Sequence, residues 1–126
     1  MFKGNFSNYV TDGDCLMVTV DGFQCRATVH HDSDTKPDSE TMPLEAFSAW
    51  CNDEWFYCGV AVTVYKAGVK LTGDYDHALW GIDCNFPNGQ EHINWHLTDV
   101  ANDLIDDAIA AAKNKIAELT KIIVDV

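Results

Sequence analysis

The fold is decided over residues 14–30, which read DCLMVTVDGFQCRATVH. Two runs rich in β-branched and apolar residues, Asp14–Val20 and Phe23–His30, flank the dipeptide Asp21-Gly22. Asp-Gly is favoured in hairpins whose two turn residues both need a positive φ. The pattern therefore predicts an antiparallel hairpin in which Val20 lies opposite Phe23.

The register of this hairpin separates its side chains into two faces, because side chains alternate along each strand. One face is apolar and carries Leu16, Val18, Val20, Phe23, Cys25 and Ala27. The other face is more polar and carries Cys15, Met17, Thr19, Gln24, Arg26 and Thr28. We expect the apolar face to pack against a second layer.

Further strands are predicted on both sides of the hairpin. An earlier strand is expected around Phe2–Val10, and Trp55–Lys66 and Ala78–Cys84 are rich in aromatic and β-branched residues. After the strand over Trp55–Lys66, the dipeptide Ala67-Gly68 is predicted to form a turn that leads into a further strand over 69–71. Either a two-residue turn with Ala67 at positive φ or a three-residue loop with Gly68 left-handed fits this turn.

Two helices are expected. Residues 43–51 form a short one that starts at Pro43, and its apolar residues Leu44, Phe47, Trp50 and Cys51 fall on one face. A long helix over 98–119 is capped by Thr98 and presents a stripe of Leu97, Ala101, Leu104, Ala108, Ala112, Ile116 and Leu119, widened by Ile105 and Ile109. The apolar tail over 122–126 prolongs that helix, adds a strand or meets another subunit.

These elements predict a single α+β domain spanning residues 1–126. We expect a mainly antiparallel sheet of five to six strands, with the long C-terminal helix packed on one face and one short helix besides. A chain of 126 residues is long enough to bury a substantial core.

Negative charge dominates the composition. Twenty Asp and Glu face eight Lys and Arg, giving a net charge of −12, and residues 71–112 contain no Lys or Arg at all. Binding to a nucleic acid needs Lys and Arg to displace counterions, so direct contact with DNA or RNA is disfavoured. Either the excess charge keeps the protein soluble, or it meets a basic protein surface.

The sequence shows no membrane span, secretory signal or CxxC pair, and these absences lead to predictions of cellular location and of the oxidation state of the cysteines. Apolar runs are far shorter than the roughly 20 residues of a membrane span, and the first residues show no secretory signal, which predicts a cytoplasmic protein. The five cysteines include no CxxC pair. In a reducing compartment we expect them to be buried free thiols.

Catalytic motifs are weak. His30, His31 and Asp32 offer metal-ligand chemistry, and His92 and His96 lie four apart, but neither group has the partners of a known zinc site. No GxSxG elbow, P-loop or GxGxxG turn is present. We expect a non-enzymatic protein with no catalytic residues, no cofactor and no metal, and keep a small metal-dependent enzyme as a remote alternative.

Candidate partner-binding residues come from two patterns. Asp99, Asp103 and Asp107 form an i, i+4 row on the long helix with Asp106 beside them, and Asp74 and Asp76 lie in the base-free stretch. A helical row rises about 6 Å per step against about 3.4 Å per phosphate, so mimicry of a DNA backbone needs Asp74, Asp76 and Asp83 as well. A merely solvated helix face is the alternative.

Aromatic residues could anchor the same partner. Trp50, Trp55, Phe56 and Tyr57 lie close together beside Asp53 and Glu54. Alternation sends Trp55 and Tyr57 to the face opposite Phe56, where Trp and Tyr often dominate binding affinity. The alternative is that all four belong to the core.

Several stretches carry a resemblance: Phe2–Gly4, Asn8–Asp14, Val20–Phe23, Asn52–Gly59 (NDEWFYCG), Leu79–Ile82 (LWGI) and Leu97–Leu104. In these the chain resembles a family of uncharacterised small proteins encoded by bacteriophages and plasmids. The resemblance implies a mobile genetic element, whose small acidic proteins often disarm host defence as anti-CRISPR or anti-restriction inhibitors. The expected partner is then a basic nucleic-acid-binding surface of a host defence complex; a homodimeric structural or regulatory module, joined through the apolar tail, is the rival.

Overall fold

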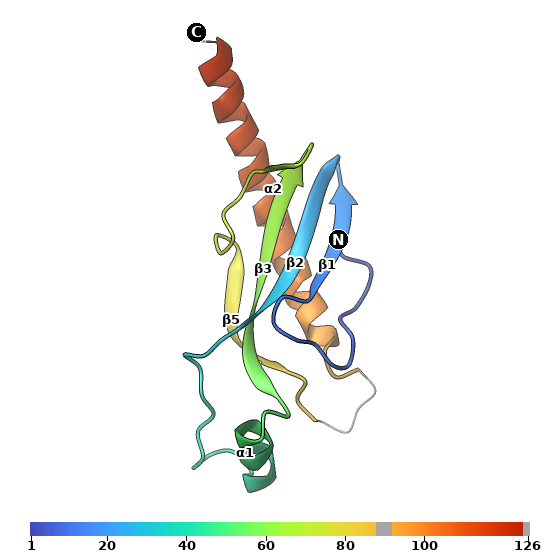
Figure 1. The fold of residues 1–126 in the computed structure, drawn as a ribbon. Helices are drawn as coiled ribbons and strands as arrows, with labels where there is room; N and C mark the ends of the chain where they lie inside the picture. The colour runs from blue at the N-terminus through green and yellow to red at the C-terminus, as the bar shows by residue number, and fades with distance from the viewer. Residues whose placement is uncertain (88–91, 125–126) are drawn as a thin grey trace.

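Five antiparallel strands form one sheet, and a long helix packs on one of its faces (Figure 1). The computed structural model describes residues 1–87 and 92–124. The strands are β1 (Cys15–Val20), β2 (Phe23–His31), β3 (Phe56–Lys66), β4 (Val69–Lys70) and β5 (Ala78–Cys84), and the helices are α1 (Leu44–Cys51) and α2 (Trp95–Val124). β1, β2 and β3 pair in that order, and both β4 and β5 pair with β3. The predicted α+β class is confirmed.

The predicted hairpin register is confirmed residue by residue. Val20 pairs with Phe23, and the register continues to Leu16 opposite Ala27. Asp21 and Gly22 have φ of 52° and 81°, as a two-residue turn of this type requires. The apolar face lies toward α2, and the predicted polar face points away from it.

The second turn takes the two-residue form. Ala67 has a φ of 50° and Gly68 a φ of 78°, and Lys66 pairs directly with Val69. Ala67 therefore accepts a backbone conformation that a residue with a Cβ rarely adopts. The resulting strand β4 is only two residues long.

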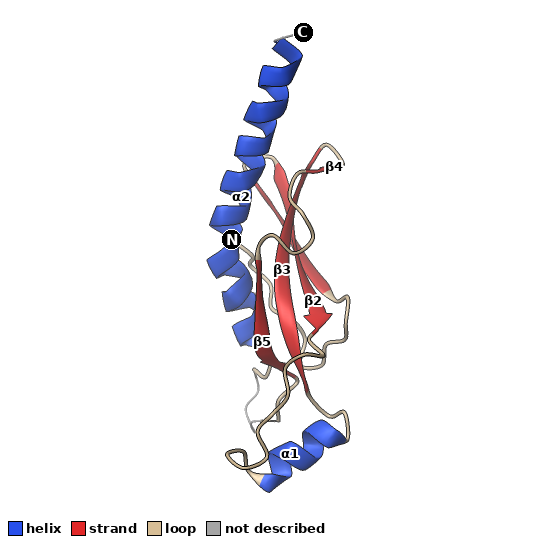
Figure 2. Cartoon of the chain, turned by 90° about the vertical axis from the view of Figure 1, so that its left-hand side faces the viewer, coloured by secondary structure: helices blue, strands red, loops and turns tan. Residues whose placement is uncertain are grey.

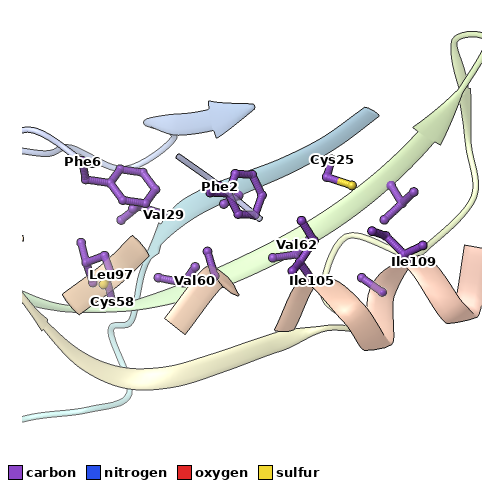
Figure 3. Packing of buried hydrophobic residues seen from close by; sticks show 14 of the residues in the cluster. Phe2, Phe6, Cys25, Val29, Cys58, Val60, Val62, Leu97, Ile105 and Ile109 are labelled. Atoms are coloured by element: carbon purple, nitrogen blue, oxygen red, sulfur yellow. The ribbon is translucent and has the colours of Figure 1, made fainter. Parts of the chain in front are cut away.

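The core lies between α2 and the sheet face that it covers (Figure 3). The side chains of α2 that are buried there include Leu97, Ala101, Ile105, Ala108 and Ala112, which confirms most of the predicted stripe. They meet the inward side chains of β2 and β3, among them Val29, Val60, Val62 and Val64. Small alanines on the helix allow its axis to approach the valine-rich sheet closely.

The predicted strand over Phe2–Val10 is wrong, because this segment has no regular secondary structure. Phe2, Phe6 and Val10 are buried in the core, four residues apart. Side-chain amides bind the backbone instead of a neighbouring strand: Phe2 N–H donates to Asn102 at 2.7 Å, and Val10 N–H donates to Asn85 at 2.8 Å.

The long helix exceeds its predicted bounds at both ends. It begins at Trp95, so Thr98 is not its cap; Thr98 is a buried residue of the first turns whose hydroxyl has no hydrogen-bond partner among the described residues. At the other end the apolar tail prolongs the helix to Val124, and residues 125–126 lie outside the described residues. Figure 2 shows the C-terminal end of α2 extending past the end of the sheet.

The short helix forms where expected, but of its predicted apolar face only Phe47 and Trp50 are half-buried. Pro43 is the residue before the helix instead of its first residue, Leu44 is 79% exposed, and Cys51 is exposed. Ala49 is the buried residue of the helix, and Trp55 Nε1–H donates a hydrogen bond of 2.9 Å to Ala46 O. α1 lies beyond one end of the sheet and covers neither of its faces (Figure 2).

Within the described ranges, neither helix has the length and apolar run that crossing a membrane requires. Among the residues drawn with secondary structure in Figure 2, no helix covers the face of the sheet opposite α2. The molecule therefore offers two contrasting surfaces to solvent, the outer side of α2 and the open face of the sheet.

Candidate partner-binding surface

Four aspartates occupy the solvent side of α2. Asp99, Asp103, Asp106 and Asp107 are all exposed, and the sheet-facing positions Ala101, Ile105 and Ala108 between them are buried. With 3.6 residues per turn, the four carboxylates gather within about a third of the helix circumference and span about 12 Å along its axis. We call these four residues the acidic stripe.

The acidic stripe has no cation paired to it within the residues that the structure describes. The contacts between acidic and basic side chains there join Lys70 to Asp74, His96 to Asp83 at 3.4 Å, and Lys113 to Asp21 at 4.0 Å. Along α2 the first basic side chain after the stripe is Lys113. The stripe therefore carries uncompensated negative charge in the free protein.

The loop acids do not extend this stripe. Asp74 forms an ion pair with Lys70, and this hydrogen bond raises the pKa of the Lys70 ammonium. Asp76 accepts a hydrogen bond of 2.8 Å from Gly73 N–H and lines a hollow of about 600 Å³ that Lys115 of α2 also lines. Both acids are exposed, and both lie close to lysines, unlike the acids of the stripe.

Trp55 cannot serve as a surface anchor, which corrects the interpretation from strand alternation. Its side chain is only 1% exposed and packs edge-on against Tyr57 and Phe86, with ring centroids 5.1 and 4.9 Å apart. Tyr57 is half-buried on the sheet face away from α2, where burial, and then the charge of Asp83, raise the pKa of its hydroxyl. Neither ring borders the acidic stripe.

Spacing limits how closely the acids can copy a nucleic acid. Asp83, the third acid that mimicry of a DNA backbone needs, lies half-buried in β5 against His96. Asp74 is paired with Lys70, and Asp76 accepts a hydrogen bond from Gly73 N–H. The stripe therefore offers a single row of carboxylates, without the further acids that mimicry of DNA needs. We therefore treat it as a charged contact surface rather than as a dense phosphate replica.

The histidines have neighbours other than metal-ligand partners. His30 packs against Tyr75 and Trp80, His31 packs against Phe56, and His92 stacks on Trp95 at 3.6 Å between ring centroids. His96 Nε2 lies 2.7 Å from the backbone oxygen of Asp83. Across residues 1–87 and 92–124, no three His, Cys, Asp or Glu side chains come together as a metal site would require.

The cysteines divide into two groups. All five are free; Cys25, Cys58 and Cys84 are buried, whereas Cys15 and Cys51 are exposed, against the expectation of burial for all. Burial raises the pKa of the Cys25 thiol, and a hydrogen bond with Cys58 together with burial raises that of Cys84. The thiols of Cys25 and Cys84 are therefore poor nucleophiles, because the thiolate is the reactive form.

One surface cluster was not predicted. Trp80, Tyr75 and His30 gather on the open face of the sheet, with Trp80 lying over Gly59 of β3. The sequence does contain the aromatic residues, but only the pairing of β5 with β3 brings residue 80 to residue 59. No local pattern in either strand indicates that register.

Comparison with family models, with curated proteins and with solved structures found no match to this chain. The resemblance to phage and plasmid proteins therefore stays a prediction.

Proposed function

We propose that this protein is a non-enzymatic, acidic binding protein whose acidic stripe contacts a basic surface of a protein partner. The observation that supports it is the stripe itself, four exposed aspartates on one side of a rigid helix with no cation paired to them among the described residues. Like charges spaced three and four residues apart destabilise a helix slightly. A partner's lysines and arginines would remove that repulsion on binding.

The biological setting that we propose is counter-defence in the bacterial cytoplasm. It rests on the resemblance to phage and plasmid proteins and on the net charge of −12. A basic channel that normally holds DNA or RNA would attract such a surface over long range, so association would be fast at low salt and slow at high salt. The inhibitor would then compete with the nucleic acid for the same surface.

Competition is the experimental test. Purified CRISPR and restriction complexes are each mixed with labelled target DNA, with and without a molar excess of this protein. The proposal expects at least one complex to lose DNA capture, with the loss diminishing as salt rises. Undiminished DNA capture across a broad panel would contradict the counter-defence setting.

A second candidate function is self-association through the tip of α2. Ile122, Ile123 and Val124 are 61%, 74% and 75% exposed on a helix that extends beyond the sheet. Leu119, 41% exposed, continues the stripe that is buried against the sheet further back. A second copy packing on this tip would bury that surface and make a homodimer.

The mass in solution separates the two candidates. The mass is measured by light scattering on the full chain and on a chain without residues 121–126. If the tip joins two copies, the full chain should be a dimer and the shortened chain a monomer. A monomer in both cases rules out the dimer and leaves the binding protein.

A further inference from the structure

The indole of Trp80 is held flat against the open face of the sheet. A Cβ on Gly59 would lie 2.3, 2.7 and 2.7 Å from three neighbouring atoms of the ring, so the bare glycine backbone contacts the ring face-on. His30 and Tyr75 border the ring, with centroids 6.3 and 5.9 Å from that of Trp80. Trp80 is nevertheless 44% exposed, so the ring face turned away from the sheet is open to solvent.

Trp80 forms one wall of a hollow of about 470 Å³. The remaining wall is the end of β2, at His31, and the loop that follows it, with Asp32, Ser33, Asp34 and Thr35. An indole facing a polar loop gives the hollow one apolar side and one side of hydrogen-bonding groups. Sites for small groups are commonly built in this way.

Asp32 holds the loop in place. One of its carboxylate oxygens accepts bonds from Asp34 N–H and Thr35 N–H at 3.1 and 3.2 Å. The other accepts a bond of 2.7 Å from the Thr35 hydroxyl and one of 3.0 Å from Gly81 N–H, next to Trp80. These bonds, that of Thr35 above all, lower the pKa of the Asp32 carboxyl, so its charge persists while its lone pairs are occupied.

Asp34 supplies the free acceptors. It is exposed, and its carboxylate makes no hydrogen bond or ion pair within the described part of the chain. Lys36 follows the loop in sequence but does not line the hollow, nor does any other Lys or Arg. The hollow therefore combines an open indole face with two negative charges.

We propose that this hollow binds an arginine side chain of a protein partner, with the guanidinium stacked on the exposed face of Trp80 and paired with the Asp34 carboxylate. A guanidinium is planar, always charged and weakly hydrated, so it stacks on indole and bonds a carboxylate at the same time. The site lies on the sheet face opposite the acidic stripe and is independent of it.

Other ligands of similar size fit less well. A nucleotide would stack on the indole too, but its phosphate would meet Asp32 and Asp34. A neutral sugar could stack on the indole and donate its hydroxyls to Asp34, yet it would leave the negative charge of the hollow uncompensated. Charge therefore favours the cation.

The test uses NMR on the whole chain and four probes: two peptides with blocked ends, a sugar and a nucleotide. The tripeptide Gly-Arg-Gly is titrated while the indole N–H signals of Trp80 and Trp95 are followed; Trp95 is the internal control because it is 43% exposed but lies at the start of α2. We expect only Trp80 to shift, with saturation on the order of millimolar concentrations. Gly-citrulline-Gly, of the same shape without the charge, methyl glucoside and a mononucleotide should leave it unmoved.

Two variants locate the contact. Trp80→Ala should weaken binding of Gly-Arg-Gly by roughly tenfold, read from the signals of the 31–35 loop. Asp34→Asn, at an exposed position, should weaken it by about threefold, while Glu40→Gln should change nothing. The proposal is overturned by an absent Trp80 shift, by equal shifts with citrulline, by binding of the sugar or nucleotide, or by an Asp34→Asn affinity equal to that of the unmodified protein.

Discussion

At the scale of the residue, Gly59 and Trp80 depend on each other. Glycine is the one residue that leaves room for the indole on the sheet, since any Cβ would overlap the ring. We predict that Gly59→Ala lowers the free energy of unfolding by about 1–3 kcal/mol, because the ring is pushed off the sheet. In a Trp80→Ala background the same change should cost nothing, which chemical denaturation of the four proteins measures. Equal costs in both backgrounds would show that the two residues do not interact.

Asp32 gives a residue-scale prediction with a pH dependence. Its four accepted hydrogen bonds lower its pKa below the ordinary 3.8 in the folded protein. A lowered folded pKa adds stability that is present above the unfolded pKa and lost as pH falls through the folded value. Asp32→Ala should therefore cost about 1–3 kcal/mol at neutral pH, and less as the pH falls below about 4. Urea unfolding of both proteins across pH measures the difference, and a cost that persists undiminished at pH 2 would contradict it.

At the scale of the element, local patterns predicted most of the fold. Asp21-Gly22 between two alternating strands determined the first hairpin, and the three- and four-residue spacing of apolar side chains determined the long helix. The ends of the helices were less well predicted, because Trp95 and Thr98 are both compatible with a first turn. The exposed acids of α2 were predicted from its helical spacing. The pairing of Asp74 with Lys70, and the hollow that Asp76 and Lys115 both line, form only in the folded chain and were not predicted.

The N-terminal segment shows why some elements are not predictable from local sequence. Its apolar residues resemble a strand, but its backbone is bound by asparagines far away in the chain: Asn85, Asn94 and Asn102. Asn94 is fully buried, and its side-chain amide donates a hydrogen bond of 2.7 Å to Ser7 O and accepts one of 2.8 Å from Asn85 N–H. No spacing rule connects residues separated by 75 to 100 positions.

This arrangement leads to a prediction for Asn94. Asn94→Ala leaves several buried polar groups without partners, so it should lower the free energy of unfolding by about 2–3 kcal/mol. Hydrogen exchange at residues 2–10 should become faster. The control is Asn114→Ala on the exposed side of α2, which should stay within about 0.5 kcal/mol of the unmodified protein. Unchanged exchange in the Asn94 variant would mean that the apolar contacts alone hold the segment.

At the scale of the whole molecule, the charge opposes folding. A net charge of −12 repels itself, and the acidic stripe concentrates part of that repulsion on one helix. We predict that Asp103→Asn, Asp106→Asn and Asp107→Asn together stabilise the free protein by about 0.5 kcal/mol at low salt. Thermal unfolding should show this gain shrinking toward zero as salt is raised to about 0.5 M. A destabilised triple variant would mean that the stripe contributes to the fold.

The central claim is that the stripe, and not the total charge, contacts the partner. The most direct measurement is the affinity of an inhibited complex for two variants of equal charge, each changed from −12 to −9 by losing three carboxylates. One is the triple variant of the stripe; the other is Glu40→Gln, Glu45→Gln and Glu54→Gln, at exposed positions outside α2. The account predicts that the stripe variant binds at least about tenfold more weakly and that the other binds almost as the unmodified protein does. Equal affinities of the two variants would contradict it.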